Sequence, residues 1–217
     1  MKIYFLVIPI IIGILFGISF SYYQEEVPAN TSILSKENLL DGATLLGDPY
    51  ADISIVEFGD YQCTFCYKFH EDTMKKINDK YVKTGNVNFF YKDFPLNGES
   101  SILASEASYC AQKQNKFWQY HDIIYDNWNG ENTGWVTKNS LLGFAKASGL
   151  NLEEYNMCMK NSEFRQKVLD NEQFAREIKI DATPSFLIFS GDEVYRIVGA
   201  QPFEKFEQVF QELGYEK

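Results

Sequence analysis

Apolar residues along the chain follow a strand pattern, then a helix pattern, then a strand pattern again. Residues 53–58 are a short run rich in β-branched and aromatic residues, which predicts a buried strand. From residue 63 to about residue 80 apolar positions recur at helical spacing, and residues 87–92 predict a second strand. Two strands joined through a helix form a right-handed crossover, so we expect them to lie parallel in one sheet.

Helical periodicity replaces the strand pattern from residue 100 to about residue 178. Helices are predicted at residues 101–115, 116–128, 138–148, 151–160 and 163–178. The strand pattern then returns as a hairpin over residues 185–198, and Pro202 begins a final amphipathic helix. A sheet interrupted by an all-helical insertion fits this order better than two domains, because neither strand group could bury its faces alone.

The N-terminal residues form the longest apolar run of the chain. Residues 3–20 are almost entirely apolar and long enough to cross the hydrocarbon core of a bilayer. Lys2 precedes this run and Glu25 and Glu26 follow it, which predicts that the N-terminus lies inside and the rest of the chain outside. We therefore expect residues 1–21 to be a transmembrane anchor or a cleaved signal peptide, and the remainder to face a compartment in which disulfides persist.

These patterns divide the chain into five expected segments. Apart from the anchor or signal peptide, they are a polar tether at 22–44, the first part of an α/β domain at 45–99, a helical insertion at 100–178 and the second part of the domain at 179–217.

Charge and cysteine content narrow the function classes. The net charge of −10 argues against a nucleic-acid partner, which would require a basic face. Four cysteines are too few for a disulfide scaffold in 217 residues. Two of them form the tight pair Cys63-Thr64-Phe65-Cys66, directly after the first predicted strand and at the start of the first predicted helix.

A CxxC pair can be half of a zinc site, a structural clip or a redox couple. Zinc needs about four ligands, but there is no second CxxC, and His70 and His121 lack the HxxxH spacing, so we expect no metal and assign both histidines to packing or to the surface. A clip that closes so small a loop constrains the chain little. A redox couple is favoured, because the N–H groups and dipole of a helix N-terminus stabilise a thiolate. Cys63 is then the nucleophile and Cys66 its resolving partner.

Thr183-Pro184 stands directly before the predicted hairpin. X–Pro bonds tolerate a cis geometry, and a proline cannot donate to a strand ladder. Next to a CxxC pair we expect Pro184 to be cis and the backbone of Thr183 to bind an incoming peptide as an added strand.

Several motifs carry a family resemblance and occur in order along the chain. They are Leu45-Leu46-Gly47-Asp48-Pro49, residues 55–66, Tyr109-Cys110-Ala111, residues 116–122 and Ala182-Thr183-Pro184-Ser185-Phe186. From Leu45 to the C-terminus the chain resembles the DsbA-like thiol:disulfide oxidoreductases of the thioredoxin superfamily. The resemblance implies an α/β thioredoxin fold with an inserted all-helical domain, no cofactor, oxidation of secreted or surface proteins and a quinone-linked membrane partner that reoxidises the enzyme.

The dipeptide between the cysteines differs from that of the best-known members of the family, whereas Glu57 matches the family pattern. Thr64-Phe65 replaces a Pro-His dipeptide, so no base or cation lies between the cysteines. Glu57, six residues before Cys63, matches the family's buried acid and is expected to relay the proton of Cys66. Lys92 is a candidate partner for Glu57, although a surface position is favoured for it.

Cys110 and Cys158 lie on two predicted helices of the insertion. We expect a structural disulfide between them, and the alternative is a second redox pair that exchanges with Cys63 and Cys66. The sequence thus predicts a membrane-anchored, monomeric, extracytoplasmic enzyme that introduces disulfides. The alternatives are a reductase or isomerase of the same fold, and a chaperone-like binding module with a structural CxxC.

Overall fold

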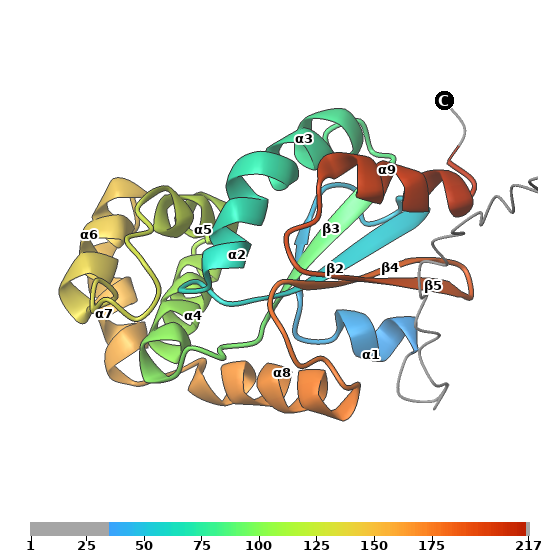
Figure 1. Ribbon diagram of the computed structural model, residues 1–217. Coiled ribbons are helices and arrows are strands. Elements are labelled where there is room, and N and C mark those ends of the chain that lie inside the picture. Colours follow the sequence, from blue (N-terminus) through green and yellow to red (C-terminus); the bar gives the residue numbers. More distant parts are fainter. Residues whose placement is uncertain (1–34, 216–217) are drawn as a thin grey trace, which may run out of the picture.

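A mixed sheet of five strands lies at the centre of the computed structural model, which describes residues 35–215 (Figure 1). The strand order is β1-β3-β2-β4-β5. β2 and β3 are parallel, as predicted, whereas β4 pairs antiparallel with β2 and forms a hairpin with β5. The strands are β1 Thr44–Leu46, β2 Ile53–Gly59, β3 Val87–Asp93, β4 Ser185–Ser190 and β5 Glu193–Val198.

The folded domain begins earlier than the sequence predicts. Helix α1, Lys36–Leu40, buries Leu39, and strand β1 adds an antiparallel edge to β3. The assignment of residues 22–44 to a tether is therefore wrong for α1 and for Thr44. Both elements are too short, at five and three residues, to carry a periodic apolar pattern of their own.

The helix that follows the cysteines is not a uniform α-helix. It runs through α2 Thr64–Phe69, the π-helical turn η1 His70–Met74, α3 Lys75–Ile77 and a second π-helical turn, η2 Asn78–Val82. The apolar stripe predicted for this segment is buried nonetheless. Single π-helical turns occur frequently at functional sites, and η1 begins one helical turn after Cys66.

The five predicted helices of the insertion are present, with ends shifted by a few residues. Figure 1 shows α4 to α7 at one end of the sheet, whereas α8 runs back across the same face as α1. Ala175 of α8 packs there with Phe58 and Leu187 of the sheet, so α8 covers the sheet as well as closing the insertion. The helices are α4 Glu99–Gln112, α5 Phe117–Asp126, α6 Lys138–Ala147, α7 Leu152–Lys160 and α8 Arg165–Glu177.

The opposite face of the sheet carries the active-site helix. α9, Phe203–Glu212, packs there beside α2 and α3 (Figure 1), and Ile55 of β2 meets Phe69 and Phe206 in the same apolar cluster. Side chains alternate between the two faces along a strand, so Glu57 shares this face with Ile55. The central strand thus places Glu57 on the side of the sheet covered by the cysteine-bearing helix.

None of the helices within residues 35–215 is long and apolar enough to cross a membrane. The predicted anchor or signal peptide at 1–21, and the predicted tether up to residue 34, lie outside the described residues.

Candidate active site

The two cysteines occupy the first turn of α2. Cys63 is the N-cap residue, and its Sγ lies 3.5 Å from the backbone nitrogen of Cys66. Both are free thiols in this structure, and Cys66 is completely buried whereas Cys63 retains a slight exposure. The turn from β2 thus places one sulfur at the helix N-terminus within reach of solvent and the other beneath it.

The environment drives the pKa values of the two thiols apart. A hydrogen bond from Cys66 is the main cause that lowers the pKa of Cys63 to about 7, with contributions from Thr183 and from the backbone of Cys66 and Phe65. Burial raises the pKa of Cys66 well above its ordinary value, and a neighbouring Cys63 thiolate raises it further. Cys63 is therefore the sulfur that ionises first, which suits a nucleophile and leaving group.

Thr183 and Pro184 lie against Cys63. The peptide bond between them is cis, and the Sγ of Cys63 donates to the carbonyl oxygen of Thr183 at 3.3 Å. β4 begins at the next residue, Ser185, and pairs with β2, so the sheet fixes the position of Thr183 relative to the cysteines.

Glu57 is buried in β2 on the face under α2. Burial raises the pKa of Glu57 well above its ordinary value, and the charge of Cys63 adds to the effect. The raised pKa favours the protonated carboxyl group over the carboxylate, and a protonated carboxyl group can exchange a proton with a nearby thiolate.

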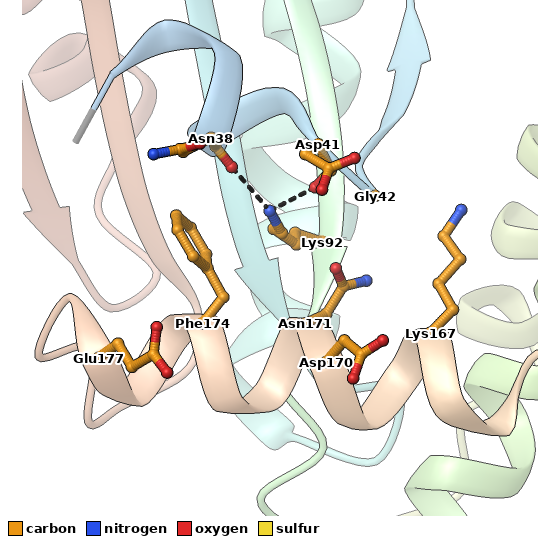
Figure 2. A pocket seen from close by; sticks show the side chains of 9 residues that line it. All are labelled: Asn38, Asp41, Gly42, Lys92, Lys167, Asp170, Asn171, Phe174 and Glu177. Carbon is orange, nitrogen blue, oxygen red and sulfur yellow. Dashed lines mark hydrogen bonds between the residues drawn. The ribbon is translucent and has the colours of Figure 1, made fainter. Parts of the chain in front are cut away.

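Lys92 is neither on the surface nor beside Glu57, so the preference for a surface position is wrong. Lys92 lies opposite Phe58 in the β2–β3 ladder, one residue beyond Glu57, and alternation therefore sends it to the other face of the sheet. Its Nζ donates to the carbonyl oxygens of Asn38 at 3.3 Å and of Asp41 at 2.5 Å, in a pocket between α1 and α8 (Figure 2). Lys92 caps the C-terminal carbonyls of α1.

A carboxylate from the insertion reaches the start of the active-site helix. Oε2 of Glu131, in the loop between α5 and α6, accepts hydrogen bonds from the backbone nitrogen of Thr64 at 3.2 Å and from its Oγ1 at 3.1 Å. The sequence shows that no base or cation lies between the cysteines. It does not show that an anion lies beside them, because Glu131 is 67 positions further along the chain than Thr64. A negative charge here competes with the Cys63 thiolate for the positive end of the helix dipole.

Asp60 holds the turn that carries Cys63 and was not singled out by the sequence. Its buried carboxylate accepts hydrogen bonds from the backbone nitrogens of Gln62 at 2.8 Å and Asn97 at 2.7 Å, and from Oγ of Ser101 at 2.6 Å. Burial raises the pKa of Asp60, and these hydrogen bonds oppose the rise. Asp60 thereby ties the active-site turn to the N-terminus of α4.

The two histidines, one on η1 and one on α5, lie together inside the protein. The ring of Tyr125 stacks on His70 with centroids 4.9 Å apart and meets His121 edge-on at 5.0 Å. Burial is the main cause that lowers the pKa of His70 to about 4. The sequence left open whether each histidine packs inside the protein or lies on the surface. Both are buried and packed against other rings.

Cys110 and Cys158 form a disulfide, with an S–S distance of 2.02 Å, that joins α4 to α7. Both residues are buried in the apolar cluster of the insertion. The described cysteines thus comprise one closed pair and one pair of free thiols.

Comparisons with known proteins bear on this site. A family model described as thioredoxin, Thioredoxin_4, matches residues 40–211. The probable disulfide bond formation protein D of Bacillus cereus is 27% identical over 147 residues, which cover 66% of this chain and 68% of that protein. Disulfide bond formation protein D of Bacillus subtilis is 28% identical over 166 residues, 75% of this chain and 74% of that protein.

Solved structures agree with these relatives. Oxidised BdbD from Bacillus subtilis has a TM-score of 0.71 at 26% identity, covering 80% of this chain and 93% of that one. Wolbachia pipientis alpha-DsbA1 has a TM-score of 0.69 at 27% identity, covering 79% and 90%. The resemblance to DsbA-like proteins and the thioredoxin fold with a helical insertion are confirmed.

Proposed function

The chain belongs to the thioredoxin family and is a DsbA-like thiol:disulfide oxidoreductase, and from this premise we propose that Cys63 and Cys66 introduce disulfides into secreted or surface proteins. The position of Cys63 carries the assignment of these two residues. Its Sγ caps the N-terminus of α2, the helix that contains Cys66, and the same sulfur lies against the carbonyl oxygen of Thr183. The backbone nitrogen of Cys66 and the N-terminus of α2 stabilise a thiolate on the exposed side of the pair.

The reaction begins from the oxidised pair. A substrate thiolate attacks Sγ of Cys63, the bond between Cys63 and Cys66 breaks, and the electron pair of that bond leaves on Cys66. A second substrate thiolate attacks the substrate sulfur of the mixed disulfide, and Cys63 leaves as a thiolate. The substrate dithiol is oxidised by two electrons and the enzyme disulfide is reduced.

Glu57 supplies the proton in this scheme. Cys66 leaves as a thiolate in an environment that disfavours its charge, and the protonated Glu57 carboxyl transfers a proton to it, directly or through water. Reoxidation reverses the transfer, with a quinone-linked membrane protein as the oxidant.

Substrate peptides lie against Thr183 and Pro184. The carbonyl oxygen of Thr183 is already 3.3 Å from the nucleophilic sulfur, so an extended peptide that pairs with this residue brings its own cysteine next to Cys63. The exposed ring of Phe65 offers an apolar contact beside the same sulfur.

The proposed location is the extracytoplasmic side of a membrane, with residues 1–21 as anchor or signal peptide and the enzyme as a monomer. The Cys110–Cys158 disulfide supports this location, because such bonds persist in oxidising compartments.

Reduction or isomerisation of disulfides is the second candidate, and one observation favours it. The pKa of Cys63 is lowered to about 7, close to the value of about 7 of thioredoxin and above the value of about 3.5 of DsbA. A thiol with the higher pKa is a poorer leaving group, which reduces the oxidising power of the disulfide.

Oxidative refolding tests the proposal. The oxidised protein is mixed with an unfolded enzyme whose native disulfides have been reduced, and the recovery of that enzyme's activity is followed. We expect rapid recovery with the wild type and none above background with Cys63→Ser or Cys66→Ser, because neither variant can form the disulfide that accepts the two electrons of the substrate dithiol. Full refolding activity in Cys63→Ser would refute the assignment, and efficient insulin reduction with a potential near that of thioredoxin would establish the second candidate instead.

A further inference from the structure

Two histidines that are 51 positions apart in the sequence lie side by side between η1 and α5. The centroids of the His70 and His121 rings are 5.6 Å apart, and the exposed fractions of the two residues are 5% and 2%. Asp122 follows on α5 with a side chain that is 57% exposed, and its Oδ1 lies 3.3 Å from Nδ1 of His121. One ligand atom from each of these three residues lies within 4.8 Å of the other two.

The buried imidazoles are not satisfied by their surroundings. Nδ1 of His70 and Nε2 of His121 are both buried, and neither has a hydrogen-bond partner among the described residues. Native proteins pair nearly all of their buried polar atoms, so two orphaned nitrogens on adjoining rings indicate that the protein accommodates something else here. An imidazole nitrogen that binds a metal ion has a partner and no longer needs a hydrogen bond.

We propose that His70, His121 and Asp122 bind one divalent transition-metal ion, with Zn²⁺ the best match. Two nitrogen donors and one carboxylate oxygen are a donor set that zinc accepts, with water in the fourth position. Bonds of about 2 Å place the centroids of two imidazoles on one tetrahedral ion roughly 5 Å apart, near the separation of the His70 and His121 rings. Ca²⁺ and Mg²⁺ prefer oxygen donors and match this site poorly.

The site needs only a small closure to hold an ion. Ligand atoms on a tetrahedral zinc are roughly 3.4 Å apart, so atoms that now lie within 4.8 Å of one another must approach by at most about 1.4 Å. Asp122 is exposed and can make this movement from the surface. The ion therefore enters from the solvent side of α5.

A second set of ligands shares His70 but is less suitable. Atoms of His70, Glu71 and Asp126 also lie within 4.8 Å of one another, but Glu71 already pairs with Lys75 at 2.9 Å. The positive charge of Lys75 interacts with Asp122 and Asp126 too, so Lys75 repels an incoming cation. The set that includes His121 is favoured, and Lys75 sets an upper limit on its affinity.

The metal site lies behind the cysteine pair and not within it. The backbone nitrogen of His70 donates to the carbonyl oxygen of Cys66, one helical turn earlier. None of the three ligands is a residue of the proposed redox reaction, so the two proposals can fail independently.

The test is a Co²⁺ titration of the full-length chain, purified without a histidine tag and with Cys63–Cys66 oxidised so that no thiol of this pair can bind the ion. The absorption spectrum of Co²⁺ reports coordination, and competition with Zn²⁺ gives the zinc affinity. We expect one ion per chain. Asp122→Ala should weaken binding at least about tenfold, since a ligand is lost. Asp126→Ala, the same change one turn later on α5, should alter the affinity by less than about threefold, through its charge alone.

Two further variants complete the design. Lys75→Gln should tighten binding, because a repelling charge is removed, and this surface change leaves the core intact. His70→Gln should abolish binding, with circular dichroism to verify the fold. If the His70 variant does not fold, Asp122→Ala and Asp126→Ala still decide the matter. The proposal is overturned if oxidised wild type does not bind Co²⁺, or if Asp126→Ala weakens binding more than Asp122→Ala does.

Discussion

The two cysteine pairs of this protein contain the same side chains but lie in different structural environments. Cys63 and Cys66 lie in one helical turn, where one sulfur caps the helix and the other is buried beneath it. Cys110 and Cys158 come from two helices, 48 positions apart in the sequence, and both are buried in the insertion.

The difference shows what makes a disulfide reactive. In the first pair, unequal environments separate the pKa values of the two thiols, so one sulfur is a good leaving group and the other is not. In the second pair, the bond joins two packed helices and closes a long loop, which restricts the unfolded chain. Reactivity thus follows from helix position and burial, and stabilisation follows from loop length.

Removal of Cys63 should have the largest effect on function. In Cys63→Ala no mixed disulfide can form, so the rate of oxidative refolding should fall by at least about 1,000-fold, as for other nucleophile deletions. The Cys110→Ala/Cys158→Ala double variant is the matched control, and we expect it to retain activity at temperatures where it remains folded. Loss of refolding activity in a folded control would show that the second pair takes part in exchange.

The same double variant should have the largest effect on stability. A loop of this length predicts a loss of about 2–4 kcal/mol in the free energy of unfolding, which denaturant titration measures. Graded reduction with dithiothreitol, followed by alkylation, should open Cys63–Cys66 before Cys110–Cys158. If both pairs open together, the distinction between a reactive and a structural pair is lost.

Glu57→Gln should affect activity and stability in opposite directions. The variant lacks the carboxyl group that we propose as the proton donor, so dithiol oxidation should slow by about tenfold to a hundredfold. The folded pKa of Glu57 is raised, so its contribution to stability is present below the ordinary carboxyl pKa and is lost as the pH rises. The variant should therefore be more stable than the wild type at pH 8, by about 1 kcal/mol, and the gain should shrink toward pH 4.

Urea unfolding at the two pH values measures this change. A gain in stability that is the same at both would mean that folding does not raise the pKa of Glu57.

Elements with their own periodic pattern were predictable from the sequence, and short ones were not. The five helices of the insertion and the hairpin carry long or paired apolar patterns, whereas β1 gains its strand conformation from pairing with β3, which no local signal shows. The burial of Lys92, where a surface position was predicted, has the same cause, because it too depends on contacts with elements distant in sequence. Its burial depends on α1 and α8, which cover a face of the sheet that the sequence alone leaves unassigned.

Groups that meet only in three dimensions were also beyond prediction. The CxxC pair, Glu57 and Thr183-Pro184 are recognisable because their chemistry is local in sequence or tied to a family motif. Glu131 and Asp60 act through contacts with distant residues, and His70 and His121 come from separate segments, so sequence spacing cannot reveal that they meet.

Glu131→Gln should have the smallest effect, and it tests how finely the reactive pair is tuned. The Glu131 carboxylate occupies the N-terminus of α2 and so competes with the Cys63 thiolate for the helix dipole. Both hydrogen bonds from Thr64 end on one oxygen, so the amide oxygen of the glutamine can accept both, but the side chain carries no charge. The pKa of Cys63 should therefore fall below its value of about 7, and the reduction potential should become more oxidising by about 10–20 mV.

The pKa shift can be followed by ultraviolet titration of the thiolate, and the potential by equilibration with glutathione. Glu153→Gln provides the control, because this residue lies in the first turn of α7, at the N-terminus of a helix that does not carry the reactive pair. It should leave both quantities unchanged. A rise in the Cys63 pKa in Glu131→Gln would mean that the carboxylate organises the helix start more than its charge opposes the thiolate, and that the insertion favours oxidation instead of restraining it.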